Sequence, residues 1–526
     1  MLEHLGKRVL VFLACVSFAN LFFLDEWDKI ASRWADAALA SPPHPTLAQF
    51  FGPLFIALFA LSLLFRIALA IAPRLSRGLA LVALLAPLNL IRINALHLER
   101  QDVIRSLGRS GAIAMFALLI ALIVFAGAAA LRWSYHLMRL PGALALLLAP
   151  LLPIQLAYNF WRFEHLPPPS AYQDQPSAPL VSGQATASGK ANARRVVWLL
   201  FDELDQSLVF DHRPSSVQLP EFDRLRRESI YADHAESPGI YTMEAVPGML
   251  TEKYVEHARE LDPGDLLLKF AGDPHAKKWS DVRNIFDDLR GEGVNSTVLG
   301  AELPYCRAIG HSLASCDWFP SGTVSIALKR PSIPDRAWYL LRTRPFTFPW
   351  LSSTRYFRAP LFDGETRRRS RAAEAASFEL MRHRAGELAV DSRFQLVFMH
   401  FPVPHLLGIY DRHTGDYSTS DSSSYLDNLA LADRTLGDVR RALESAGLWD
   451  KTTLLVTSDH PLRDWIIEDA GWWNDRETAS LGPVPRRYVP FLFKIPAEPP
   501  HEIHDERPWG LRLRFPLTQI LAGPRM

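Results

Sequence analysis

Two apolar segments of the sequence end in side chains of the kind that bind metals. Residues 196–203 read VVWLLFDE, with Asp202 near the end, and residues 452–460 read TTLLVTSDH, ending in Asp459 and His460. In an open α/β sheet, ligands bind where the carboxyl ends of the strands meet. Carboxylate oxygens and an imidazole nitrogen at that edge are ligands for a divalent transition metal. The sequence therefore predicts one metal site, for Zn²⁺ or Mn²⁺, that includes these three residues.

The region between these segments supplies hydroxyl groups and two further imidazoles. Thr242 lies in GIYTMEAVPGMLTEKY, where a Pro-Gly turn precedes a helix-like run, and His400 and His405 flank the loop HFPVPH. A threonine at a helix start can cap the helix, or it can be a nucleophile that a metal activates and the helix amides align. Ser237 and Thr251 suit either role equally well, so the residue types alone leave the nucleophile open.

Each acid taken alone has a simpler explanation. A carboxylate at a strand end can be the N-cap of the following helix. Holding a charged group at the end of a buried apolar strand is nevertheless costly. Two segments built in the same way therefore favour a shared metal site over two unrelated helix caps.

Strands and helices alternate around these residues. The 196–203 segment is too short for a helix of its own, and its continuous apolar run predicts a buried central strand. Further strands are predicted at residues 296–299, 394–400, 453–457 and 489–494. An apolar stripe predicts a helix over residues 425–444, which Gly447 ends. This alternation predicts an α/β sandwich with a mostly parallel central sheet.

Length and charge restrict the class of protein. A chain of 526 residues with 48% hydrophobic and 21% charged residues is too long for one ordinary domain. The net charge of +1 gives no basic footprint for nucleic acid, so no nucleic-acid partner is expected. The first third of the chain is apolar with few acids, which separates it from the remainder.

About five apolar runs in that first third are close to the length of a membrane-spanning helix, so residues 1–163 are expected to form a transmembrane domain; the runs are residues 9–24, 48–73, 78–96, 110–131 and 142–161. The first run enters Asp25, Glu26 and Trp27 without a cleavage site, which favours an uncleaved anchor over a signal peptide. The segment AALAS at residues 37–41 is a weaker processing site.

The distribution of arginines predicts an orientation. Five crossings that start inside place the rest of the chain outside the membrane, and the basic loops fit this except for the third. That loop carries Arg92, Arg100, Arg105 and Arg109. These side chains can snorkel to the interface, or Arg100 and Arg105 can hold the phosphate of a lipid near the outer surface.

A tether and an exported domain follow the membrane part. Residues 164–194 are rich in Pro, Ser, Gly and Ala and are expected to form a flexible linker, so residues 195–526 form the catalytic domain. Cys306 and Cys316 lie in YCRAIGHSLASC, where the exported location favours a disulfide over a metal site with His311. Cys15 lies inside the first apolar run, where it is expected to serve as a small apolar residue.

These motifs resemble the alkaline phosphatase/sulfatase superfamily. The order strand-Asp202, Thr242 five residues before Pro247, the HFPVPH loop and the TSDH motif carries the likeness. More narrowly, the layout is similar to the membrane-anchored branch that includes phosphoethanolamine transferases and lipoteichoic acid synthases. The resemblance implies a C-terminal domain of the alkaline phosphatase type on the outer, periplasmic face of a bacterial inner membrane, anchored by several spans.

The resemblance also assigns roles. It implies that Asp202, Thr242, Asp459 and His460 surround one Zn²⁺ or Mn²⁺, that Thr242 attacks a phosphodiester, and that His405, or secondarily His400, binds phosphate or acts on the leaving group. Glu203 stands where sulfatases carry a second acid, so it either assists in metal binding or contacts the metal ligands and orients them. Sulfatases use a Cys or Ser nucleophile in a C/S-x-P-x-R motif, which here reads Ala-Val-Pro-Gly-Met over residues 245–249. Pro461 and Glu252 depart from the glycines usual at these positions.

The expected activity is transfer of a phosphoryl-alcohol group, of phosphoethanolamine or phosphoglycerol type, from a membrane phospholipid to an envelope glycan or glycolipid through a covalent threonine intermediate. The alternatives are a hydrolase of the same superfamily, acting as a phosphodiesterase or phosphatase, and a membrane protein with a vestigial site. A monomer is expected.

Overall fold

The chain forms two compact units. Residues 1–166 with 325–361 make the first unit, and residues 167–324 with 362–526 make the second. The computed structural model describes residues 2–23, 27, 47–73, 140–165, 194–261, 265–319, 332–343, 364–405, 407–463, 486–504 and 514–522. The expected linker falls almost wholly outside these ranges.

The first unit is helical. Its helices are α1 (Leu2–Leu21), α4 (Leu47–Ile71), α8 (Leu140–Leu147), α9 (Leu151–His165) and α15 (Ile333–Thr343). Helix α1 packs against α4 and α8, and α15 packs against α4. Leu340 of α15 is buried in one cluster with Leu54 and Leu58 of α4. The sequence analysis did not address the packing of α15 against α4, because an amphipathic helix far along the sequence does not reveal its partner.

Two described stretches are long and apolar enough to cross a bilayer. These are Phe51–Ile71, with a mean hydropathy of 2.6, and Ala143–Trp161, with 1.6; Arg8–Leu21 is apolar but shorter. The expected third and fourth runs, with Arg100 and Arg105, lie outside the described residues. Among the described residues there are therefore two candidate spans instead of about five, judged by length and composition alone.

The second unit is built on an eight-stranded sheet with the order β13-β2-β12-β11-β1-β8-β6-β7. The strands are β1 (Arg195–Asp202), β2 (Ile230–Ala232), β6 (Ser296–Ala301), β7 (Ser315–Phe319), β8 (Leu396–Pro404), β11 (Thr452–Ser458), β12 (Phe491–Lys494) and β13 (His501–Ile503). Only β12 pairs antiparallel with its neighbours. The mostly parallel sheet predicted from the sequence is confirmed, and each predicted strand overlaps one of these.

Strand β1 explains why the central strand is apolar throughout. Val197, Leu199 and Phe201 belong to one core cluster, whereas Val196, Trp198 and Leu200 belong to another. Because side chains alternate along a strand, these clusters lie on opposite faces of the sheet.

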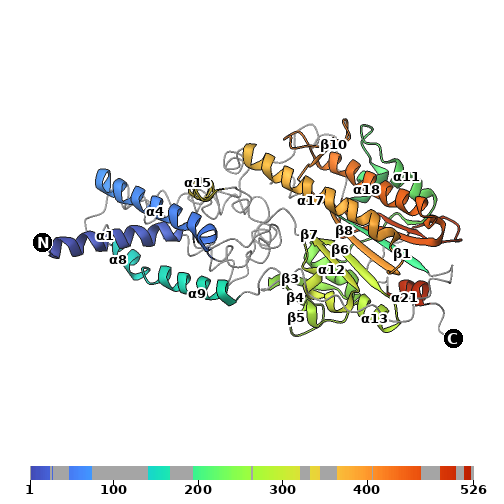
Figure 1. Ribbon diagram of the computed structural model, residues 1–526, viewed down its shortest axis with the longest axis horizontal. Helices are drawn as coiled ribbons and strands as arrows, with labels where there is room; N and C mark the ends of the chain where they lie inside the picture. Colours follow the sequence, from blue (N-terminus) through green and yellow to red (C-terminus); the bar gives the residue numbers. More distant parts are fainter. Residues whose placement is uncertain are drawn as a thin grey trace. The chain divides into compact units, whose positions relative to one another are not determined.

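Helices cover both faces (Figure 1). The first cluster includes residues of α11 (Pro220–Arg227), α17 (Gly364–Val390) and α18 (Tyr425–Ser445). The second includes residues of α12 (Thr242–Thr251), α13 (Ile285–Gly291), α14 (Tyr305–Ala308) and α21 (Arg514–Ala522). A three-stranded sheet of β3 (Val255–Leu261), β4 (Asp265–Phe270) and β5 (Lys277–Lys278) and a hairpin of β9 (Tyr410–Asp411) and β10 (Asp416–Tyr417) complete the described strands. Helix α18 matches the predicted helix at residues 425–444, and Gly447 after it has a positive φ of 65°.

Candidate metal centre

Asp202 and Asp459 meet at the carboxyl edge of the two central strands. Strands β1 and β11 are parallel neighbours in which Phe201 is opposite Ser458, so the next residues, Asp202 and Asp459, are adjacent. Both carboxylates are fully buried. Asp459 Oδ1 accepts hydrogen bonds from the backbone N–H groups of Glu203, at 3.1 Å, and His460, at 2.8 Å. These bonds fix the orientation of the Asp459 carboxylate.

His460 completes the group. Its Nε2 lies 3.6 Å from Asp202 Oδ1 and 3.4 Å from Asp459 Oδ2. Its other ring nitrogen, Nδ1, lies 3.1 Å from the carbonyl oxygen of Pro461. Because a carbonyl oxygen only accepts, this contact places the ring proton on Nδ1 and leaves the lone pair of Nε2 facing the two carboxylates.

This arrangement fits a bound cation. Both oxygens of Asp202 and Oδ2 of Asp459 are buried without a hydrogen-bond partner among the described residues. Burial, together with the charge of Asp459, raises the pKa of Asp202 well above its usual value. Burial also lowers the pKa of His460 to about 3, which keeps its imidazole neutral. Two carboxylates and a neutral imidazole nitrogen that face one another are all acceptors, so they cannot form hydrogen bonds with each other. They can all bind one divalent metal.

Thr242 reaches the same place from a helix end. It is the first residue of α12, and its Oγ1 lies 3.4 Å from His460 Nε2. The preceding loop is held by Ser237, whose hydroxyl donates to the carbonyl of Asp459 and to that of Gly239. Thr251 lies at the opposite end of α12, where its hydroxyl donates to Pro247 O at 2.7 Å. Of the three hydroxyl groups considered from the sequence, it is that of Thr242 that lies 3.4 Å from His460 Nε2.

The amino end of α12 favours an anion at this position. The first backbone N–H groups of a helix carry a partial positive charge and point away from the helix. A phosphate or sulfate group in contact with Thr242 would lie at that end.

A charged group of three residues borders the metal site. Arg463 Nε donates to Glu203 Oε1 at 2.6 Å, and Arg463 Nη2 lies 3.4 Å from His405 Nε2. His405 Nε2 lies 3.7 Å from Glu203 Oε2. The guanidinium also lies over the ring of Tyr241, 5.6 Å from its centroid. Glu203 therefore contacts a cation and an imidazole, and the cation lies over the ring of Tyr241, the residue before Thr242.

The backbone turns sharply at Glu203. Its φ is 62°, a region that non-glycine residues seldom adopt. Its carbonyl accepts a hydrogen bond from Tyr425 Oη at 2.7 Å. Glu302, which directly follows β6, has the same feature with a φ of 65°. Such strain is common at functional sites and persists where the surroundings fix it.

His400 lies deeper than the sequence suggested. It is fully buried in β8, and its Nδ1 lies 2.8 Å from Tyr305 Oη. Burial lowers the pKa of His400 to about 4 and raises that of Tyr305 well above its usual value. The structure thus brings His405 to the border of the site, with its side chain 35% exposed, and keeps His400 in the core.

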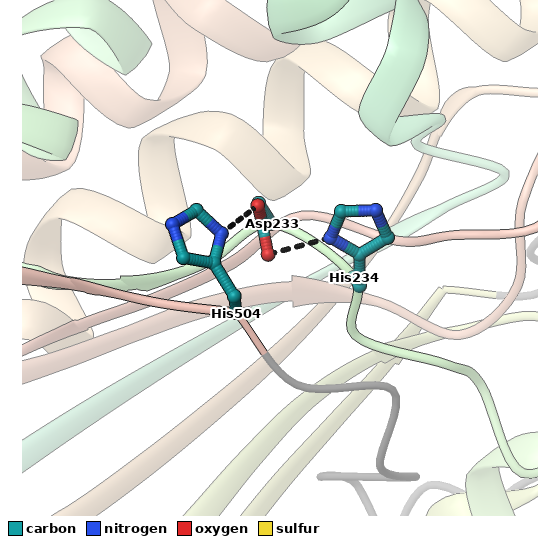
Figure 2. Close-up of side chains that lie close together, drawn as sticks. All are labelled: Asp233, His234 and His504. Carbon is teal, nitrogen blue, oxygen red and sulfur yellow. Dashed lines mark hydrogen bonds and ion pairs between the residues drawn. The ribbon is translucent and has the colours of Figure 1, made fainter.

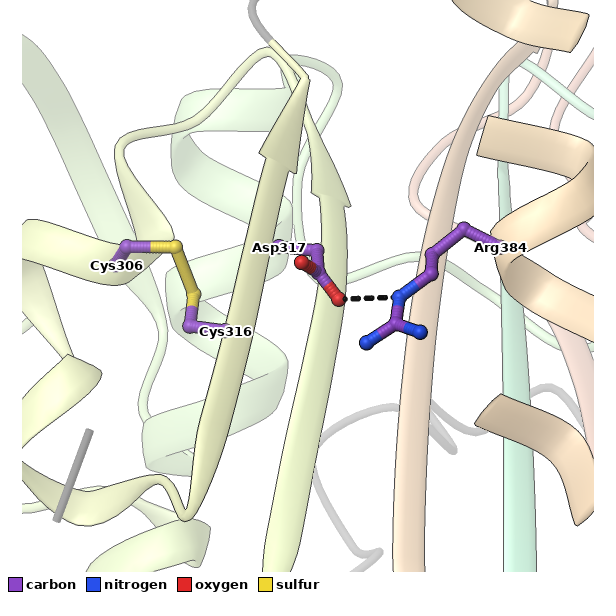
Figure 3. The surroundings of a disulfide bond; sticks show 4 residues. All are labelled: Cys306, Cys316, Asp317 and Arg384. Atoms are coloured by element: carbon purple, nitrogen blue, oxygen red, sulfur yellow. Dashed lines mark hydrogen bonds and ion pairs between the residues drawn. A yellow bond between two sulfur atoms is a disulfide. The ribbon is translucent and has the colours of Figure 1, made fainter. Parts of the chain in front are cut away.

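A disulfide holds the helix that carries Tyr305. Cys306 of α14 and Cys316 of β7 are joined (Figure 3). On the other side of β7, Asp317 accepts from Arg384 Nε of α17 at 2.9 Å. The edge strand is therefore fixed both to α14 and to α17, and α14 positions Tyr305 against His400.

Two residues of this region were missed from the sequence. Glu302 directly follows the apolar strand β6, as Glu203 directly follows β1, so an acid after an apolar strand was visible there as well. Burial raises the pKa of Glu302. His405 opposes this shift, and the charge of Asp459 adds to it. Arg463 stands four positions after Asp459 without any periodic pattern, and only the fold shows that it turns toward Glu203.

The chain has similarities to known proteins in sequence and in structure. The sequence matches the sulfatase family model over residues 194–463. No curated protein sequence matches the chain significantly. Among solved structures, a Bacteroides thetaiotaomicron protein from work on the metabolism of multiple glycosaminoglycans is 13% identical, with a TM-score of 0.42, 64% of this chain covered and 79% of that chain. The phosphonate monoester hydrolase of Agrobacterium radiobacter is 14% identical, with a TM-score of 0.36 and coverages of 63% and 74%.

Proposed function

The chain belongs to the sulfatase family, whose members act on sulfate or phosphate esters as hydrolases or transferases, and we propose that it transfers a phosphoryl-alcohol group through Thr242. The donor is a membrane phospholipid and the acceptor is an envelope glycan or glycolipid. The transferred group is of phosphoethanolamine or phosphoglycerol type, as in the membrane-anchored branch that the motifs resemble.

The observation that carries this proposal is the position of the Thr242 hydroxyl. It lies at the start of α12 and 3.4 Å from His460 Nε2, beside two buried carboxylates. The motif positions at which sulfatases carry their Cys or Ser nucleophile read Ala-Val-Pro-Gly-Met here. A threonine nucleophile therefore favours a phosphate ester over a sulfate ester.

Asp202, Asp459 and His460, with Thr242, would hold one divalent metal, Zn²⁺ or Mn²⁺. When bound, it would supply positive charge that lowers the pKa of the threonine hydroxyl and neutralises phosphate charge. The protein groups around it then have separate tasks in the reaction.

In the first step, Thr242 Oγ1 forms a bond to phosphorus as the ester bond to the diacylglycerol oxygen breaks, and the hydroxyl proton passes to solvent. Arg463 and the amide groups of α12 hold the phosphate oxygens. His405 in its protonated form gives a proton to the leaving oxygen. In the second step, an acceptor hydroxyl loses its proton to His405 and attacks the phosphothreonine. The bond between phosphorus and Thr242 Oγ1 breaks, and this oxygen takes a proton from solvent, which restores the Thr242 hydroxyl.

Hydrolysis is the second candidate. The same first step followed by attack of water would make the chain a phosphodiesterase. The two candidate spans favour a donor that lies in the bilayer, because a site held near the membrane surface meets a lipid more often than a soluble ester.

The test compares a phosphate diester and a sulfate monoester as substrates of the purified full-length chain. We expect turnover of the diester in Zn²⁺ or Mn²⁺, and we expect Thr242→Ala to reduce it by roughly 10³-fold or more, because removal of a nucleophile abolishes the covalent route. Thr251→Ala is the matched control, since it removes a hydroxyl from the other end of the same helix. Faster turnover of the sulfate ester, or equal activity of both variants, would refute the proposal.

A further inference from the structure

A second group of side chains of metal-binding types lies at the edge of the sheet, where β12 separates its strand β2 from β11 of the first group. It consists of Asp233, His234 and His504 (Figure 2). Asp233 follows β2 directly and His504 follows β13 directly. These two strands are parallel, and their last residues, Ala232 and Ile503, are opposite each other. Asp233 and His504 are therefore the next pair in the same register, and Asp233 N donates to Ile503 O at 3.3 Å.

Backbone pairing, and not chance contact between flexible side chains, sets this proximity. His504 Nδ1 lies 2.5 Å from Asp233 Oδ2. His234 Nδ1 lies 2.7 Å from Asp233 Oδ1, so the two imidazoles contact different oxygens of one carboxylate, as Figure 2 shows. The side chain of Asp233 is only 14% exposed, whereas those of His234 and His504 are 43% and 75% exposed. The carboxylate is thus fixed and the imidazoles are open to solvent.

The ring of His234 is also held by packing. It lies edge-on to the ring of Tyr488, with the centroids 4.7 Å apart. The backbone of Tyr488 pairs with Glu236, and its carbonyl accepts from Gln206 N at 3.1 Å. Tyr488 therefore has a fixed position, and His234 loses little freedom when it binds a ligand.

We propose that Asp233, His234 and His504 bind a second transition-metal cation, of the Zn²⁺ class, that fastens β13 to β2. One ligand atom from each residue lies within 4.8 Å of the others. Two imidazole nitrogens and one carboxylate oxygen are a donor set that suits Zn²⁺, with the fourth position left for water. This site shares no residue with the group of Asp202, Asp459 and His460.

The position of β13 gives this metal a structural task. β13 has three residues, and among the described strands it stands at the end of the sheet order and pairs with β2 alone. So short an edge strand buries little and makes few ladder hydrogen bonds. A cation bound by residues that follow both strands would join them at their carboxyl ends and oppose fraying of this edge.

The experiment counts metal retained by the full-length protein after loading with Zn²⁺ and gel filtration in metal-free buffer. We expect two equivalents in the wild type and one in His234→Ala/His504→Ala. Asp459→Asn should also retain one, and the combination of all three changes should retain none. His501→Ala, an exposed histidine of the same strand, is the matched control and should retain two equivalents.

The single variant His504→Ala keeps the test valid if the double variant folds poorly, because this side chain is three-quarters exposed. It should also lose one equivalent. Equal zinc in the wild type and in both histidine variants would overturn the proposal and would mean that the two histidines contact Asp233 without holding a metal. That outcome is separable from failure of the catalytic site, in which Asp459→Asn would retain as much zinc as the wild type.

Discussion

Replacement of Arg463 by Gln tests whether the guanidinium of Arg463 both stabilises the fold, through its pair with Glu203, and binds the substrate. Arg463 Nε and Glu203 Oε1 are 2.6 Å apart, and the two side chains are 12% and 0% exposed. Without the guanidinium, the carboxylate of Glu203 stays buried without its cation. Burial of an unpaired charge of this kind costs about 3–5 kcal/mol.

The cost can be converted into a melting temperature. The second unit has roughly 320 residues, so at about 2.1 cal/mol/K of unfolding entropy per residue 1 kcal/mol corresponds to roughly 1.5 °C, and the expected decrease is about 4–7 °C. Arg487→Gln is the matched control, because Arg487 lies 2.6 Å from Glu236 but has a side chain that is 57% exposed. An exposed pair contributes about 0–1 kcal/mol. Its removal should therefore shift the melting temperature by a few degrees at most.

The assay is thermal unfolding of the purified full-length protein, with diester turnover measured on the same samples. Arg463→Gln should also lower turnover by roughly 10²–10³-fold, the effect of removing one preorganised donor. The double variant Glu203→Gln/Arg463→Gln removes the unpaired carboxylate, so it should regain much of the stability but not the activity. Equal melting shifts for Arg463→Gln and Arg487→Gln would refute the structural reasoning. Recovery of turnover in the double variant would refute the role in substrate binding.

Two further expectations follow from other parts of the structure, and one follows from the sequence. Burial raises the pKa of Asp433 to about 7, so the folded state holds a proton that the unfolded state releases near pH 4, and stability should fall as pH rises from about 4 to 7. Melting temperatures across that range should decrease less in Asp433→Asn, and parallel curves would contradict the assignment. Replacing Cys306 and Cys316 by Ser should lower the melting temperature while leaving retained metal unchanged, so loss of the catalytic metal would contradict the separation of the two. Arg100→Gln/Arg105→Gln should slow reaction with a lipid donor and spare a small soluble diester, whereas equal effects on both substrates would exclude lipid recognition by these arginines.

The central strands and the grouping of Asp202, Asp459 and His460 as a candidate metal site could be predicted from the sequence because their signals are local. A short, continuous apolar run such as that of β1 is typical of a strand that is buried on both faces of a sheet. An acid at its end is visible without knowledge of the fold. The same rule would also have identified Glu302, the residue directly after β6.

Residues whose role depends on contacts distant in sequence could not be predicted. Arg463 pairs with Glu203 over a separation of 260 residues, and His504 meets Asp233 over 271. His400 carried the same sequence signal as His405, yet its place inside β8 makes it a buried partner of Tyr305. Only the strand register distinguishes the two histidines.

The mass of Thr242 after reaction tests the central claim most directly. Full-length protein is mixed with a phospholipid donor in Zn²⁺ or Mn²⁺ without an acceptor, quenched in acid, digested and analysed by mass spectrometry. We predict a phosphoryl-alcohol adduct on the peptide that contains Thr242, with a mass that identifies the donor headgroup, and no adduct in Thr242→Ala. Turnover of the donor with Thr242 unmodified at every quench time, or an adduct on another residue, would contradict the account.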